Sequence, residues 1–294
     1  MITRGIYSAT CSIFNDNYSL NIDDTINHAA SSIDNGLHGV FFFGSTGQAQ
    51  LISQKEKKEL ISKAASHKLR KKFYFGNGCN SLNDTIDLIK YGSEYGFKDW
   101  LIMPPAYYKG NTENGVYNFY KHIILNVPTI KIILYNFEKL SSFLFKPEFV
   151  KKLVSDFPKN IVGVKDSSYN LYEHLNIPNF LIFPGSEAKL LKSLKLGSAG
   201  TISAITQVTH SLARKVFDDY EKKNNQTLNE KLIAVRETFD RFNLISALHS
   251  YFLTKNNNFK NLLPPLLLLQ PKEKDDLIKQ LNKLKFSIDK NLAA

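Results

Sequence analysis

This chain of 294 residues has only two cysteines and no long apolar run. Cys11 and Cys79 do not form a CxxC pair, and two thiols cannot supply a disulfide framework for a chain of this length. A reduced, cytoplasmic setting is therefore expected. The most apolar run, from Leu262 to Leu269, is broken by two prolines, whereas a membrane-spanning helix needs about 20 apolar residues. The first ten residues also lack a signal-peptide core. We therefore expect a soluble protein with no membrane association.

Missing sequence motifs exclude several classes of function. There is no GxGxxG motif after the first expected strand, which argues against a dinucleotide-binding fold. The seven histidines are dispersed and form no HExxH motif, so no metal site is expected. The formal net charge is +11, but the lysines are scattered and interleaved with acidic residues. No basic stripe with interleaved aromatic residues is evident, so nucleic acid is not an expected partner.

Short apolar runs alternate with longer helical patterns through most of the chain. Such runs flanked by glycine or proline favour buried strands over helices. The expected strands are 6–8, 39–43, 72–76, 100–103, 131–135, 161–165, 181–183 and 200–203. Helices between them imply parallel strands with right-handed crossovers. Eight such strands predict a closed (β/α)₈ TIM barrel, and an open doubly wound sheet is the alternative.

The pattern changes after Ser203, where the remaining segments are helical with no obvious strands between them. One of these helices would close the barrel, and the others would form a small appendage. We therefore expect a (β/α)₈ barrel over residues 1–225 and a C-terminal helical appendage over residues 226–294. No linker or repeat indicates independent domains.

Catalytic groups of such barrels lie at the C-terminal ends of the strands. Lys165 follows the apolar run Ile161–Val164 and therefore emerges into the barrel mouth. An ordinary lysine titrates at about 10.4, and desolvation favours the neutral amine that attacks a ketone. Taken alone, Lys165 could equally extend its amine from a strand end to solvent. The neighbouring strand ends decide between these interpretations.

Tyr135 ends the preceding strand, where a phenol can relay protons. A structural tyrosine of the core, with its hydroxyl hydrogen-bonded, would give the same sequence pattern. The segment Gly44–Gly47 offers backbone N–H groups and two hydroxyls that suit a carboxylate such as that of pyruvate. It could also be a simple strand-to-helix turn. Cys79, in Asn77-Gly-Cys79, is more consistent with a structural role than with a nucleophile.

Together these segments resemble the family of dihydrodipicolinate synthase, N-acetylneuraminate lyase and 2-keto-3-deoxygluconate aldolase. The resemblance runs from the first strand to about Ser203. The matching motifs, in order and spacing, are GSTGQ at 44–48, PPAYYK at 104–109, ILYN at 133–136, VGVKDSS at 162–168 and GTIS at 200–203.

The resemblance implies a class I aldolase that needs no cofactor. Lys165 would form the Schiff base with pyruvate and Tyr135 would relay protons. Ser45, Thr46 and Gly47 would serve the relay and the pyruvate carboxylate. Tyr108 matches a tyrosine that reaches an active site across a subunit interface, and the backbone of Ile202 would approach the bound pyruvate. The family is usually a homotetramer, a dimer of dimers, and the same assembly is expected here.

Departures from the family pattern bear on the second substrate. Dihydrodipicolinate synthases carry an arginine soon after the YN pair, and here Leu140 stands at that position, with Lys139 beside it. A leucine cannot replace a bidentate carboxylate clamp. The pair Leu140-Ser141 looks more like the neuraminate lyase branch. Gln48 replaces the usual glutamate after GSTG, and Glu138 replaces the usual proline after YNx.

Polar residues after the sixth and seventh strands are candidates for binding the substrate tail, namely Ser167, Gly185, Ser186 and Glu187. Glu187 is either an acceptor for a diol or a carboxylate that complements a helix N-terminus. Lys109 could meet an anionic group at the far end of the substrate, although a surface role is the simpler interpretation.

Three functions are therefore considered. The first is cleavage of a 2-keto-3-deoxy sugar acid to pyruvate and an aldehyde. The second is dihydrodipicolinate synthase activity, the condensation of pyruvate with aspartate semialdehyde. The third is a non-catalytic protein that binds a keto acid. The retained set of Lys165, Tyr135, Ser45 and Thr46 argues against the third, because a sensor has no need of a proton relay.

Overall fold

The computed structural model describes residues 1–288, and the last six residues of the expected appendage lie outside that range. Eight parallel strands form one sheet in the order β7-β6-β5-β4-β3-β2-β1-β8. They are β1 (Gly5–Ala9), β2 (Gly39–Phe42), β3 (Phe73–Gly76), β4 (Asp99–Ile102), β5 (Lys131–Asn136), β6 (Ile161–Asp166), β7 (Leu181–Pro184) and β8 (Gly200–Ser203).

The two end strands of this order meet, since the backbone N–H of Ala199 donates to the carbonyl of Ile182 at 2.8 Å and Thr201 Oγ1 donates to the carbonyl of Pro184 at 2.7 Å. The (β/α)₈ barrel is thus confirmed, and the open sheet is excluded.

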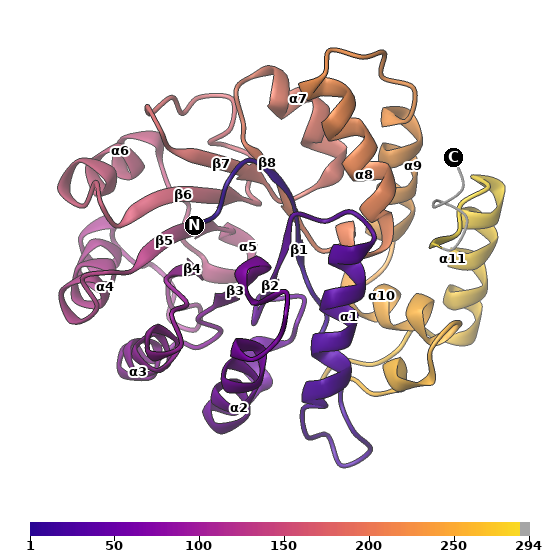
Figure 1. Ribbon diagram of the computed structural model, residues 1–294, viewed down its shortest axis with the longest axis horizontal. Coiled ribbons are helices and arrows are strands. Elements are labelled where there is room, and N and C mark those ends of the chain that lie inside the picture. Colours follow the sequence, from indigo (N-terminus) through magenta and orange to yellow (C-terminus); the bar gives the residue numbers. More distant parts are fainter. Residues whose placement is uncertain (289–294) are drawn as a thin grey trace.

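Helices surround the strands on the outside (Figure 1). They are α1 (Ile22–Asp34), α2 (Gln54–Ala65), α3 (Leu82–Glu94), α4 (Glu113–Asn126), α6 (Pro147–Asp156), α7 (Leu190–Lys195) and α8 (Thr206–Glu221). The short helix α5 (Glu138–Ser141) directly follows β5 and lies inside this ring (Figure 1). Short 3₁₀ turns are η1 (Ala49–Leu51), η2 (Arg70–Lys72), η3 (Glu187–Lys189) and η4 (Asn257–Lys260). The connection from β6 to β7, residues 167–180, contains turns and bends and no helix. Its side chains are therefore free to face the barrel mouth.

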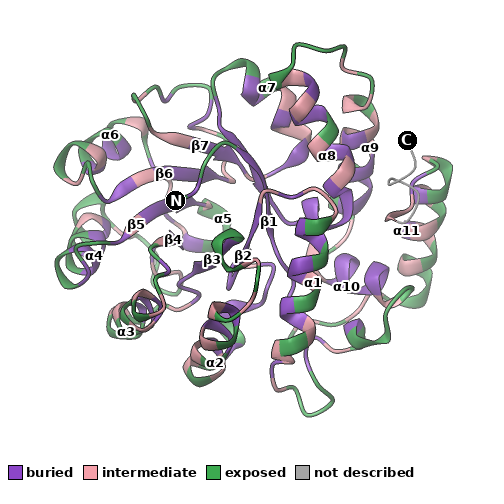
Figure 2. Cartoon of the chain, in the orientation of Figure 1, coloured by how far each residue is buried: buried purple, intermediate pink, exposed green. Residues whose placement is uncertain are grey.

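Local sequence explains where these helices begin and end. The Ser53 hydroxyl accepts from the backbone N–H of Glu56, and the Glu56 carboxylate accepts from that of Ser53, which forms a capping box at the start of α2. Gly36 follows α1 with a φ of 117°, a conformation that favours glycine. The outer faces of the helices are exposed, whereas the strands are buried (Figure 2).

Side-chain alternation along the strands separates two apolar cores. One lies between the strands and the helices. The other fills the barrel interior and includes Tyr7, Phe41, Tyr74, Leu101, Ile133, Tyr135, Phe183 and Ile202. Because this interior plug is packed, a ligand can enter only at the mouth, above the C-terminal ends of the strands.

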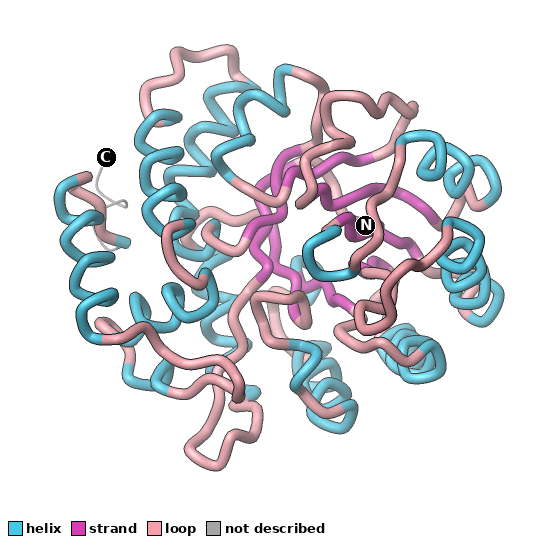
Figure 3. The backbone as a smooth tube through the Cα atoms, turned by 180° about the vertical axis from the view of Figure 1, so that it is seen from behind, coloured by secondary structure: helices cyan, strands magenta, loops and turns pink. Residues whose placement is uncertain are grey.

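The C-terminal helices α9 (Asn229–Asp240), α10 (Leu244–Leu253) and α11 (Pro271–Lys283) gather on one side of the barrel, beside α8 and α1 (Figures 1 and 3). The expected boundary at residue 225 falls between α8 and α9. Within residues 1–288, no helix combines the length and apolar character that crossing a bilayer requires.

Candidate active site

Lys165 and Tyr135 lie side by side at the ends of β6 and β5. They are directly paired in the parallel ladder, so side-chain alternation turns both into the barrel. Lys165 is 3% exposed, and its Nζ lies 4.2 Å from the centroid of the Tyr135 ring. Within residues 1–288, no carboxylate forms an ion pair with Lys165. The amine is therefore buried beside a phenol and has no carboxylate within ion-pair distance among the described residues.

The loop after β2 brings a second hydroxyl to this pair. Ser45 Oγ lies 3.1 Å from the Tyr135 hydroxyl, and Thr46 is buried next to it. A Cβ on Gly47 would lie 3.0 Å from the carbonyl oxygen of Thr10, a tight contact that a larger residue could make only if the backbone moved by a few tenths of an ångström. Gly47 thus positions the loop and does not line the cavity beside Lys165.

A cavity of about 520 Å³ opens at the barrel mouth beside Lys165. Six of the predicted site residues line it, namely Ser45, Thr46, Tyr135, Lys165, Ser167 and Gly185. A Cβ on Gly185 would lie 2.1 Å from Ser167 Oγ, so the missing side chain of Gly185 makes room for the Ser167 hydroxyl. The structure therefore brings together the expected lysine, relay and hydroxyl groups around one volume.

The loop after Lys165 is held by the carboxylate of Asp166, which is fully buried. It accepts backbone N–H bonds from Tyr169 at 2.9 Å, Leu171 at 2.9 Å and Tyr172 at 3.1 Å, and a bond from the Asn136 amide at 2.8 Å. Burial raises the pKa of Asp166, and these bonds oppose that rise without cancelling it. Since Asn136 and Asp166 directly follow Tyr135 and Lys165, the clamp fixes both strand ends.

Glu187 does not have the position expected for a substrate-binding residue. It is fully buried and does not line the cavity. Its carboxylate accepts from Ser203 Oγ at 2.7 Å and from Arg236 Nη1 at 3.0 Å, so its bonding capacity is used within the protein. The sequence correctly predicts that Glu187 follows the seventh strand. It does not reveal that Arg236, on α9, pairs with Glu187 and turns its side chain inward.

Two other predicted residues also lie outside the cavity lining. The Ser186 side chain is buried and caps η3, where it accepts from the backbone N–H of Ala188 at 3.3 Å. Ile202 is fully buried in the barrel interior and packs beneath the site.

Tyr108 does not line the cavity of its own chain. Tyr107 and Tyr108 are 76% and 75% exposed and lie in the loop after β4.

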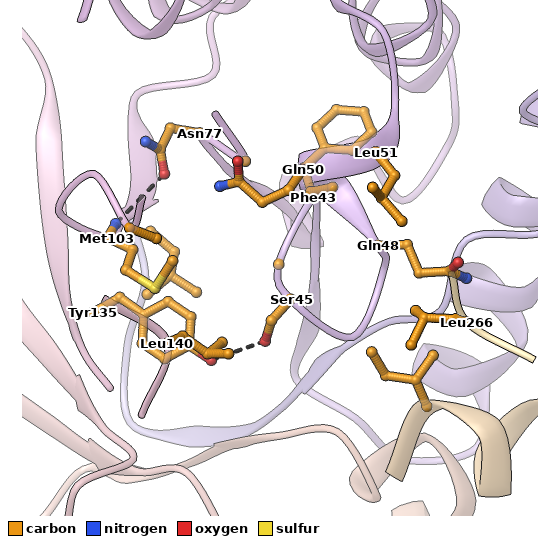
Figure 4. Close-up of a pocket in the computed structure, with 16 residues that line it drawn as sticks. Phe43, Ser45, Gln48, Gln50, Leu51, Asn77, Met103, Tyr135, Leu140 and Leu266 are labelled. Atoms are coloured by element: carbon orange, nitrogen blue, oxygen red, sulfur yellow. Dashed lines mark hydrogen bonds between the residues drawn. The ribbon is translucent and has the colours of Figure 1, made fainter. Parts of the chain in front are cut away.

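A second cavity of about 250 Å³, mostly apolar, lies beside Ser45 and Tyr135 (Figure 4). Its lining includes Phe43, Leu51, Met103, Leu140 and Leu266.

Glu138 and Lys139, noted in the sequence as departures from the family pattern, also line this cavity. The sequence did not identify Ser168, Tyr169, Arg236 and Asp240 as lining residues. The Arg236 Nε donates to both carboxylate oxygens of Asp240 at 2.9 Å, and Nη1 contacts Glu187. Arginine and aspartate four residues apart on a helix signal an ion pair, but the sequence does not reveal which way that pair faces. Within the described residues, no cluster of histidine, cysteine and carboxylate side chains suits a metal ion.

Comparisons with known proteins agree with this geometry. The model of the dihydrodipicolinate synthetase family matches residues 2–284. The 2-dehydro-3-deoxy-D-gluconate/2-dehydro-3-deoxy-phosphogluconate aldolase of Picrophilus torridus is 30% identical over 237 residues, which cover 77% of this chain and 86% of the relative. The 4-hydroxy-tetrahydrodipicolinate synthase of Thermosipho africanus is 33% identical over 185 residues, or 60% of this chain and 62% of that one.

The fold is shared with YagE from E. coli K12, a prophage protein of the dihydrodipicolinic acid synthase family whose structure was solved in complex with pyruvate. The TM-score is 0.87 at 22% identity, over 98% of this chain and 100% of that chain. The family match over nearly the whole chain, with relatives that are aldolases and synthases, establishes the reaction class. The chain belongs to the dihydrodipicolinate synthetase family and is a carbon–carbon lyase.

Proposed function

We propose that this lyase cleaves a 2-keto-3-deoxy sugar acid reversibly to pyruvate and an aldehyde, through a Schiff base on Lys165. The observation that carries the proposal is the buried Lys165 amine over the Tyr135 ring, with the Tyr135 hydroxyl 3.1 Å from Ser45 Oγ. This arrangement supplies a nucleophile and a proton relay within one cavity.

The proposed reaction starts when the Lys165 amine attacks the C2 ketone to give a carbinolamine. Tyr135 donates its phenolic proton to the carbinolamine hydroxyl, which leaves as water and gives an iminium ion. The phenolate formed in that step takes the proton from the C4 hydroxyl, the C3–C4 bond breaks, and the aldehyde departs. The bond electrons move to the iminium and give an enamine. A proton returns to C3, and water hydrolyses the imine to release pyruvate and the free Lys165 amine.

The lining of the cavity supports a hydroxylated tail over a second carboxylate. Arg236 lines the cavity, but Glu187 and Asp240 balance its charge. Ser167, Ser168 and Asp240 offer partners for hydroxyl groups. Leu140, at the position of the synthase arginine, contributes to the apolar cavity instead. The similarity to the aldolase of Picrophilus torridus also supports a sugar acid as the substrate.

Dihydrodipicolinate synthase activity is the second candidate, and one observation favours it. Lys139 lines the cavity and is exposed, so its ammonium group can meet a second carboxylate. Similarity to the synthase of Thermosipho africanus supports the same candidate.

A homotetramer is the proposed assembly, in which Tyr108 of one subunit completes the site of another. The exposure of Tyr107 and Tyr108 supports this, as does the apolar cavity beside Tyr135, which offers room for a tyrosine from a second copy. Cytoplasmic location is likewise proposed, because Cys11 and Cys79 are both free thiols.

A substrate panel combined with borohydride trapping tests the proposal. Pyruvate should be trapped as a secondary amine on Lys165, located by peptide mapping. Among 2-keto-3-deoxygluconate with and without phosphate, N-acetylneuraminate, and pyruvate with aspartate semialdehyde, a sugar acid should give the highest kcat/KM. Trapping on another lysine, or none in a folded sample, would overturn the mechanism.

A further inference from the structure

Tyr169 has an unusual backbone conformation at the wall of the cavity. Its φ is 59°, in the left-handed region that side chains other than glycine rarely adopt. It lies in the helix-free connection between β6 and β7, four residues after Lys165. A strained residue persists where the surrounding structure enforces it, and such residues cluster at functional sites.

The Asp166 clamp enforces this conformation. One carboxylate oxygen, Oδ1, accepts from the backbone N–H of Tyr169 and from the Asn136 amide, and the other accepts from Leu171 and Tyr172. Because Asp166 is fully buried, an unbonded carboxylate there would be costly. The loop therefore has little freedom to relax Tyr169 into an ordinary conformation.

The clamp places the Tyr169 ring in the wall of the cavity, together with Gly185, Arg236 and Asp240. Lys189 Nζ lies 5.9 Å from the centroid of this ring, and the Tyr169 hydroxyl is hydrogen-bonded to Ser186. A ring with a hydroxyl at this wall offers an apolar face to a carbon chain and a hydrogen-bonding group to its hydroxyls.

We infer that Tyr169 is a specificity-determining residue that contacts the substrate beyond the bond that breaks. The inference rests on the proposed aldolase function. The keto-acid carbons are bound at Lys165, so the remainder of the substrate must extend along the cavity toward other walls. Tyr169 and the neighbouring Arg236 and Asp240 form one such wall, and they touch a long aldehyde but not a short one.

The test is the condensation of pyruvate with aldehydes of two, three and four carbons, namely glycolaldehyde, glyceraldehyde and erythrose, by the full chain. Tyr169→Gly should lower kcat/KM about tenfold or more for the longer aldehydes, the order of one lost hydrogen bond and ring contact, mainly through KM. For glycolaldehyde the change should be within about twofold, because its chain ends short of this wall. Tyr169→Phe removes the hydroxyl alone, so comparing it with Tyr169→Gly separates the contribution of the hydroxyl from that of the ring.

Tyr18→Gly is the matched control. Tyr18 also has a left-handed backbone, with a φ of 63°, and it is 52% exposed outside the cavity lining. Both glycine substitutions remove the same strain, so neither should lower the melting temperature appreciably. Only Tyr169→Gly should change the dependence on aldehyde length.

Three outcomes overturn the inference. Equal losses for all aldehydes, or no loss, would remove Tyr169 from substrate recognition. A marked fall in melting temperature with uniform loss would indicate a purely structural role. Borohydride trapping of pyruvate on the unmodified chain separates these from a failure of the function itself: an absence of trapping overturns the aldolase proposal and this inference together.

Discussion

The Nζ of Lys165 lies 4.2 Å from the centroid of the Tyr135 ring, and the two residues are paired in the β5–β6 ladder. One register relationship thus places a buried amine over a buried phenol. A single-residue slip would turn one of them toward the outer helices, because side chains alternate along a strand. The chemistry proposed for this site therefore depends on the register of two adjacent strands.

Lys165→Arg should abolish both activity and trapping of pyruvate. A guanidinium stays protonated and forms no imine, while its positive charge and length are similar to those of lysine. Electrophoresis and mass spectrometry after borohydride treatment provide the measurement. The surface variant Lys192→Arg, at a lysine paired with Glu173, should be trapped normally. Trapping that persists in Lys165→Arg would assign the imine to another lysine.

Tyr135→Phe should fold normally and lose roughly 10²–10⁴-fold in kcat, the usual contribution of a positioned acid–base group. Ser45→Ala should have a smaller effect of the same kind, since it removes the hydroxyl that contacts Tyr135. Tyr74→Phe is the control, because Tyr74 lies in the same barrel interior near the start of β3, at the opposite end. Near-normal turnover by Tyr135→Phe would exclude it from the relay.

Leu140→Arg should shift the enzyme toward condensation with aspartate semialdehyde. A charge-assisted bond to the second carboxylate contributes about 1.5–3 kcal/mol, or roughly 10–100-fold in kcat/KM. Steady-state rates for both reactions on one preparation give the ratio. Lys139→Ala tests whether the neighbouring lysine already binds that carboxylate. If the unmodified chain condenses the semialdehyde at least about tenfold faster than it cleaves a sugar acid, the synthase assignment replaces ours.

Arg236→Met should lower the free energy of unfolding by about 3–5 kcal/mol, because it leaves the Glu187 carboxylate buried without its cation. The double variant Arg236→Met, Glu187→Gln should recover much of this loss, since the carboxylate left without Arg236 is then only that of Asp240, which is partly exposed. Urea denaturation measures both. A double variant as unstable as Arg236→Met would show that the unpaired Glu187 carboxylate is not the cause of the loss.

Stability should fall as the pH drops from about 6.5 toward 4. Burial lowers the pKa of His210 and of His249 to about 4, against an unfolded value of about 6.5. Between these values the unfolded chain binds more protons than the folded one, so acid favours unfolding. Each histidine contributes at most about 1.4 kcal/mol per pH unit.

Urea denaturation at pH 7.5, 6.0 and 5.0 measures this dependence. His249→Gln should reduce the slope of the unfolding free energy against pH. The surface control Lys192→Arg should keep the slope of the unmodified chain. A slope that is the same in His249→Gln would show that other groups carry the pH dependence.

The sequence determined the order of the strands and the residues at their ends. Runs such as Ile161–Val164 are apolar because both faces of a barrel strand are buried, so the strand and the position of Lys165 could be predicted together. Helix α8 begins at Thr206, only three residues after β8 ends. Its first turn is polar yet buried, with Gln207 bonded to the carbonyl of Ala204 and the N–H of Cys11.

Only the tertiary structure decided what faces the cavity. Glu187 and Arg236 are 49 residues apart, and their ion pair turns a predicted substrate ligand into an internal support. Tyr169 enters the cavity because Asp166 holds a backbone conformation that its sequence does not favour. Periodicity and motif spacing describe local geometry, whereas these contacts depend on how α9 and the β6–β7 connection pack over the barrel mouth. Because a charge buried without a partner is costly, each of these buried charged groups must be paired or hydrogen-bonded.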